Sequence, residues 1–144
     1  MFNTLSFFQP VFGSQPPKKL DNELQKLVRS VDKSMLRTKT LRDSFESIGN
    51  TQKPVVAVID DLHEIETDIN GDNIKDLSHC ETVSLYTANS ASVLPIGIDV
   101  NDSNSSMDDI TKLFKAIKDG AKVDAINLSI GLAVDREVFN SLFK

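Results

Sequence analysis

Polar side chains that can act as acids, bases or nucleophiles follow three apolar runs of this 144-residue sequence. Asp60 and Asp61 follow the first run, Asp99 follows the second, and Ser129 lies near the end of the third. His79 begins a predicted helix between the first two runs. In an open parallel sheet, ligands and catalytic groups gather at the carboxyl ends of the strands. The sequence therefore predicts that these side chains converge at one edge of a sheet.

Each of these residues also has a purely structural interpretation. His79 can start a helix and make a structural hydrogen bond, and Ser129 with Gly131 can simply end a strand. Cys80 is either a reactive thiol or a small buried side chain, and burial is the more common role of a single cysteine.

Three blocks of the sequence resemble, in family order, the first half of a subtilisin-like serine protease. Residues 56–60 are similar to the strand that delivers the catalytic aspartate, and residues 78–84 to the His-Gly-Thr-His-Val-Ala-Gly helix start. Residues 116–131 resemble the helix and strand that end in Ser-Leu-Gly and line the substrate cleft, and this block is the most specific. The resemblance covers residues 54–131.

The resemblance implies a role for each matching residue. Asp60 would orient the imidazole of His79, and His79 would act as the general base. Ser129, Ile130 and Gly131 would pair with an extended peptide by adding it to the sheet. The implied partner is a peptide or protein, and no cofactor is implied.

The sequence also departs from the family pattern. Leu62 and Cys80 stand where the family has glycines, and the spacing between Asp60 and His79 is short. The chain reaches Lys144 without a Gly-Thr-Ser-Met-Ala nucleophile, an oxyanion asparagine or a Gly-x-Ser-x-Gly motif. A base without a nucleophile does not hydrolyse amides, so we expect this chain alone to be an inactive protease.

Two function classes follow from this departure. In the first, the chain is a fragment or degenerate form of a subtilisin-like endopeptidase that keeps Asp60 and His79. In the second, it is a pseudoprotease that serves as a protein-interaction module, such as a secreted bacterial effector. A native end at Lys144 favours the second class, and a native chain that continues favours the first.

Two further hypotheses concern metal ions. Oxygen ligands at alternate positions resemble the start of a calcium loop, although the sixth and twelfth positions lack the glycine and glutamate of an EF-hand. These candidate ligands are Asp68, Asn70, Asp72 and Asp76. A receiver domain would use Asp60 and Asp61 for magnesium, Asp99 for phosphate and Ser129 as the sensor. Against it, residues 61–93 are too few for the elements that a receiver needs there.

The charge and the cysteine content limit partners and location. Residues 1–53 carry a net charge of +4 and residues 54–144 a net charge of −9, so the acidic body argues against nucleic acid as a partner. Cys80 is the single cysteine, which rules out an intrachain disulfide and fits a reducing compartment. The N-terminus has neither a Sec signal nor a spanning length of apolar residues. We expect a protein that does not enter membranes and is cytoplasmic or exported without a Sec signal peptide.

The elements that must position these residues alternate in type after residue 54. We predict an α/β fold, half of a subtilisin-like doubly wound domain, with a parallel sheet of about three strands and flanking helices. A flexible segment, residues 1–17, and a helical extension, residues 18–53, precede this half domain of residues 54–144. The predicted strands are residues 55–59, 93–98 and 123–130, and the predicted helices are residues 78–89, 108–119 and 135–143. Residues 61–77 and 99–106 are predicted loops.

The helical extension carries an apolar stripe that needs a surface to pack on. Residues 18–48 are one long helix or a helical hairpin, with a break near residues 38–40. The stripe consists of Leu24, Leu27, Val28, Val31 and Met35. A sheet of three strands leaves an edge or a face without cover. We therefore expect self-association, a bound partner, or coverage by this extension, which could serve as a prodomain or docking arm.

Overall fold

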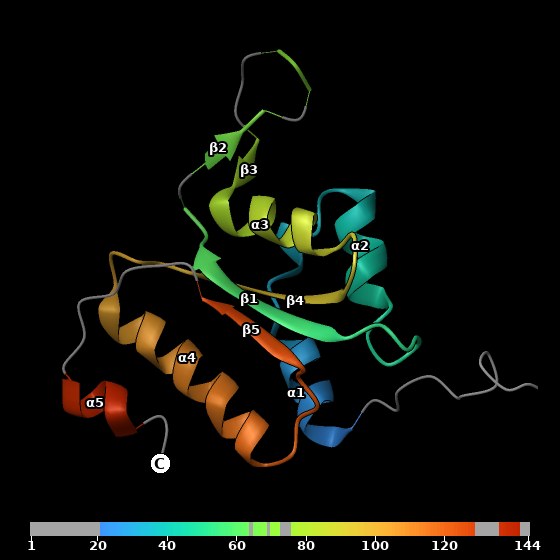
Figure 1. Ribbon diagram of the computed structural model, residues 1–144. Coiled ribbons are helices and arrows are strands. Elements are labelled where there is room, and N and C mark those ends of the chain that lie inside the picture. Colours follow the sequence, from blue (N-terminus) through green and yellow to red (C-terminus); the bar gives the residue numbers. More distant parts are fainter. Residues whose placement is uncertain (1–20, 64, 69, 73–75, 129–135, 142–144) are drawn as a thin grey trace, which may run out of the picture.

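The computed structural model describes residues 21–63, 65–68, 70–72, 76–128 and 136–141 (Figure 1). The N-terminal part contains α1 (Asn22–Ser30), the 3-10 helix η1 (Lys33–Met35) and α2 (Lys39–Glu46). The elements that follow are β1 (Val55–Asp61), β2 (Ile65–Thr67), β3 (Leu77–Ser78), α3 (His79–Thr87), β4 (Ser92–Ile98), α4 (Ser103–Lys118), β5 (Ala125–Leu128) and α5 (Arg136–Ser141).

The main sheet has three parallel strands in the order β4-β1-β5, which confirms the predicted α/β fold. Val56 of β1 pairs with Val93 on one side and with Ala125 on the other. Ala57, Val58 and Ile59 are completely buried, because β1 is the central strand and both of its faces are covered. This explains why the sequence of β1 is a continuous apolar run rather than an alternating one.

Helices cover both faces of this sheet. Figure 1 shows α2 and α3 on one face, while α1 and α4 lie on the other face and contact each other. The predicted helix around residues 78–89 is found as α3, and its start is fixed by Ser78, whose side chain accepts a hydrogen bond from the Glu81 N–H. None of the described helices is both long and apolar enough to cross a membrane.

The helical extension is two helices separated by η1, and not one long helix. The break begins at Val31, earlier than the predicted break, and Thr38 instead caps α2 by accepting a hydrogen bond from the Leu41 N–H. Gly49 has a φ of 83°, a left-handed conformation that suits the end of a helix. Buried side chains of α1 and α2, such as Leu24 and Leu41, belong to the same core cluster as β1. The extension therefore helps to build the core of the α/β body.

Two predicted loops contain regular structure. α4 starts at Ser103, inside the segment expected to be a loop, because the Asp102 side chain accepts a hydrogen bond from the Ser105 N–H and caps the helix. Strands β2 and β3 form a small antiparallel pair within the segment expected to be a polar loop. Leu77 of β3 is buried, which gives this pair an apolar anchor.

Candidate functional site

Asp60 and His79 meet at the carboxyl end of β1. His79 Nδ1 lies 2.6 Å from Asp60 Oδ1. Asp60 is 1% exposed, whereas the side chain of His79 is 31% exposed. The expected contact between the two side chains is therefore present, with a buried carboxylate behind a solvent-accessible imidazole. Their catalytic role stays a prediction.

Local sequence fixes the position of His79. His79 is the first residue of α3, and Ser78 and Glu81 form a capping box around it. The Glu81 N–H donates to Ser78 Oγ at 3.2 Å, and the Ser78 N–H donates to Glu81 Oε1 at 3.1 Å. A capping box fixes the backbone at the start of a helix. Ser78 and Glu81 therefore fix the backbone from which the His79 side chain projects.

The strand fixes Asp60 in a similar way. Asp60 Oδ1 accepts a second hydrogen bond from the Asp61 N–H, at 2.8 Å. Asp60 Oδ2 is buried and has no hydrogen-bond partner within the described part of the chain. The carboxylate is thus held through one oxygen, the same oxygen that contacts His79.

This geometry assigns the tautomer of a neutral His79. A carboxylate oxygen accepts hydrogen bonds, so the imidazole proton must lie on Nδ1, facing Asp60. The lone pair then lies on Nε2, which becomes the basic nitrogen. Asp60 would also stabilise the imidazolium that forms when Nε2 takes a proton. The pair has the geometry of an oriented general base.

Cys80 is a structural residue in this arrangement. Its side chain is completely buried, and Sγ lies 4.0 Å from the Val58 carbonyl oxygen of β1. Burial, and to a smaller extent the nearby charge of Asp60, raises the pKa of the Cys80 thiol to about 12. The thiol therefore stays protonated at neutral pH and is a poor nucleophile. Of the two interpretations of Cys80, the structure supports the buried one.

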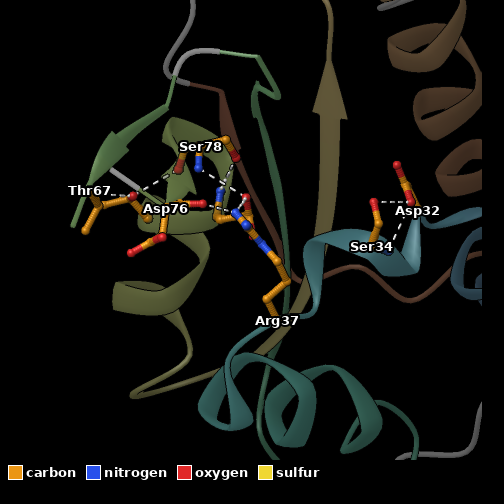
Figure 2. Close-up of polar contacts among 8 residues, drawn as sticks. Asp32, Ser34, Arg37, Thr67, Asp76 and Ser78 are labelled. Atoms are coloured by element: carbon orange, nitrogen blue, oxygen red, sulfur yellow. Dashed lines mark hydrogen bonds and ion pairs between the residues drawn. The ribbon is translucent and has the colours of Figure 1, made fainter. Parts of the chain in front are cut away.

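Arg37 is part of this region, although sequence reasoning did not identify it. Figure 2 shows Arg37 extending from the segment between η1 and α2 toward the start of α3. Arg37 donates from Nε to Glu81 Oε2 at 3.0 Å and from Nη2 to Glu81 Oε1 at 2.8 Å. It also donates to the Asp76 carbonyl oxygen. Arg37 and Glu81 are 44 positions apart in sequence, and no local sequence pattern connects them.

The other acidic residues at this edge do not gather around one point. Asp61 Oδ1 accepts a hydrogen bond from the His63 N–H at 2.9 Å, and His63 Nε2 lies 3.8 Å from Asp99 Oδ2. Across the described ranges, one group of three carboxylates is close enough to share an ion, and Asp60, Asp61 and Asp99 are not in it. The arrangement thus does not support the magnesium site of the receiver alternative.

The group that does converge belongs to the predicted calcium loop. Ligand oxygens of Asp68, Asp72 and Asp76 all lie within 4.8 Å of one another. Asn70 donates its side-chain N–H to Asp76 Oδ2 at 3.0 Å, which accounts for one of the Asp76 oxygens. Exposed acidic groups often lie close together without an ion, and the calcium hypothesis stays a prediction.

The predicted substrate-binding residues Ser129, Ile130 and Gly131 lie outside the described residues. The described part of β5 ends at Leu128.

Comparison of this chain with known proteins finds no matching family model, no matching curated protein and no matching solved structure.

Proposed function

We propose that this chain carries the aspartate–histidine half of a subtilisin-like serine endopeptidase site, as a fragment or degenerate form of such an enzyme. The observation that supports the proposal is the 2.6 Å contact between Asp60 Oδ1 and His79 Nδ1. In the family that the sequence resembles, this contact orients the general base.

The proposed chemistry is one proton transfer. His79 Nε2 takes a proton from a hydroxyl nucleophile, and Asp60 stabilises the resulting imidazolium. The 144 residues contain no Gly-Thr-Ser-Met-Ala sequence to supply that hydroxyl. The chain alone is therefore expected to be unreactive toward peptide bonds and toward fluorophosphonate probes, which label activated serines. Labelling that disappears with a serine substitution would contradict this expectation.

An activated ester tests the base without requiring the nucleophile. Hydrolysis of p-nitrophenyl acetate is expected to fall strongly in His79→Gln and partly in Asp60→Asn. His63→Gln is the matched control, because His63 is the other histidine of the chain and is exposed. Equal rates in the wild type and His79→Gln, or equal losses in both histidine variants, would contradict the proposed role of His79.

The exposed edge of β5 favours a second candidate function, a non-catalytic peptide-binding module. Ala125 and Leu128 are exposed, and β5 pairs with β1 on one side only within the described sheet. An extended peptide that adds to this edge would shift the backbone amide signals of β5 in NMR spectra. If binding is the whole function, it is expected to be the same in the wild type and in His79→Gln.

A further inference from the structure

A second concave site lies between α1, β4 and α4. It is a pocket of about 270 Å³, and neither Asp60 nor His79 lines it. Its walls come from α1 and the turn after it, from η1, from the carboxyl-terminal half of β4 and from α4. Figure 1 shows α1 and α4 on the face of the sheet opposite α3, the helix that carries His79. The pocket is therefore separate from the proposed general-base site.

The floor of the pocket is apolar and closely packed. Leu27, Met35, Leu62 and Ile96 are among the apolar residues that line it. Gly97 belongs to the same floor, and a Cβ there would come within 2.8 Å of both the Leu62 side chain and Met35 Sδ. A small residue at this position lets both side chains approach the strand. This surface suits the hydrocarbon part of a ligand.

The rim of the pocket is charged. Asp32, Asp109 and Lys112 line it, which gives two carboxylates and one ammonium group. One carboxylate oxygen of Asp32 is already in use, because Asp32 Oδ1 accepts hydrogen bonds from the Ser34 N–H at 3.0 Å and from Ser34 Oγ at 2.7 Å (Figure 2). Asp109 differs from Asp32, because its carboxylate has no such hydrogen bonds within the described ranges.

The carboxylate of Asp109 is partly buried and makes no hydrogen bond or salt bridge to a described residue. Burial raises the pKa of Asp109, and the nearby charge of Lys112 opposes this increase. Removing a carboxylate from water without giving it a partner is unfavourable. A cation placed in the pocket would provide that partner, whereas an anion would meet two carboxylates and a neutral ligand would leave Asp109 unpaired.

We propose that this pocket binds an organic cation, with its ammonium or guanidinium group at Asp109 and its apolar stem on the floor between α1 and β4. Such a group occurs on a free alkylamine and on a lysine or arginine side chain of a partner. Lys112 limits the affinity, because its positive charge lies at the same rim. The site is independent of the proposed endopeptidase function.

The test uses n-pentylammonium as the probe and 1-pentanol as its uncharged counterpart, titrated into the intact chain and followed by NMR. We expect shifts at Leu27, Gly97 and Lys112, and at least tenfold weaker binding of pentanol, because charge-assisted hydrogen bonds are the stronger ones. Asp109→Asn is expected to weaken binding of the ammonium about tenfold. Lys112→Gln is expected to strengthen it.

Asp108→Asn is the matched control, since Asp108 is exposed, is adjacent in sequence and does not line the pocket. It removes the same formal charge and is expected to change the affinity less than about twofold. Equal effects of the two substitutions, or equal binding of pentanol and pentylammonium, would overturn the proposal. N-acetyl-lysine methylamide identifies the source of the cation: binding similar to pentylammonium assigns a protein side chain, and much weaker binding assigns a free amine.

Discussion

Glu81 is the residue on which the start of α3 depends. It is 4% exposed, and its carboxylate accepts hydrogen bonds from the Ser78 N–H and from two nitrogens of Arg37. A buried carboxylate is tolerated when its oxygens are paired in this way. This pairing also raises the pKa of the Arg37 guanidinium, and the hydrogen bonds to Glu81 are the largest cause. Glu81, the capping-box residue two positions after His79, is thus tied to Arg37 of the N-terminal segment.

Replacing Arg37 with alanine leaves the buried carboxylate of Glu81 without its charged partner. We expect Arg37→Ala to lower the free energy of unfolding by about 1–3 kcal/mol, measured by urea denaturation. Lys39→Ala removes an ion pair in which both Lys39 and Asp43 are exposed, and it is expected to cost less than about 0.5 kcal/mol. Similar losses of unfolding free energy in the two variants would show that the burial of Glu81 does not make the Arg37–Glu81 pair more stabilising than an exposed pair.

Cys80 predicts how stability responds to alkaline pH. Its pKa is raised from 9.0 to about 12 in the folded chain, mainly by burial. Between these values the unfolded chain loses the thiol proton while the folded chain keeps it, so the folded state binds more protons. The free energy of unfolding is therefore expected to fall as the pH rises from about 9 toward 12. Denaturation curves recorded across this range measure the slope.

The control for this prediction is Cys80→Ala, in which the thiol no longer titrates. Its absolute stability is expected to be lower because Cys80 is buried in the core. The relevant quantity is the slope with pH, which should be shallower than in the wild type. An unchanged slope would assign the alkaline destabilisation to other groups.

At the scale of elements, the N-terminal helices behave as part of the body. Leu24 and Leu27 of α1 and Leu41 and Phe45 of α2 are buried in the core cluster that contains β1. A detachable arm would keep its apolar residues in a separate cluster. The packing therefore favours an integral role for α1 and α2 over that of a removable prodomain.

Leu24→Ala tests this integration. Leu24 is buried on α1, and we expect its truncation to lower the free energy of global unfolding by about 2–5 kcal/mol. Arg29→Ala lies on the exposed face of the same helix and is expected to cost less than about 0.5 kcal/mol. The readout is chemical denaturation followed by fluorescence of Tyr86, which lies on α3. A Leu24→Ala variant that unfolds α1 alone, with an unchanged Tyr86 transition, would contradict the integral role.

At the scale of the whole molecule, the two edges of the sheet differ. The start of the β4 edge is contacted by α2, because Ser44 Oγ donates to the Ala91 carbonyl oxygen at 2.8 Å and accepts from the Val93 N–H at 3.0 Å. Beyond β5, no further strand pairs with the sheet among the described residues. The helical extension thus contacts the start of this edge, and coverage by the extension is one of the three outcomes that the sequence left open.

The β5 edge predicts weak self-association. Unpaired strand edges with exposed apolar side chains recruit other chains, and Leu128 is 42% exposed. We expect the apparent mass in light scattering to rise with protein concentration and Leu128→Lys to reduce this rise. Tyr86→Lys is the matched control, because Tyr86 is 74% exposed but lies on α3, away from the edge. A constant monomer mass in the wild type, or equal effects of the two substitutions, would exclude this edge as the contact.

The sequence by itself determined the features that depend on neighbouring residues. The apolar run of residues 55–59 indicated a buried strand, found as β1, and residues 78–89 were predicted to be a helix, found as α3. The start of α4 was placed too late because Asp102 was not recognised as a cap. These features follow from propensity and from hydrogen bonds between residues a few positions apart, which sequence reasoning can evaluate.

Only the tertiary structure decided which distant side chains meet. The resemblance had suggested that Asp60 meets His79 across 19 positions, and the structure shows this contact. No sequence pattern suggested that Arg37 meets Glu81 across 44 positions. The tertiary structure also placed the partly buried carboxylate of Asp109 in a pocket whose other walls come from α1, η1 and β4. Such contacts depend on the relative positions of packed helices and strands, and a periodic pattern within one element does not contain that information.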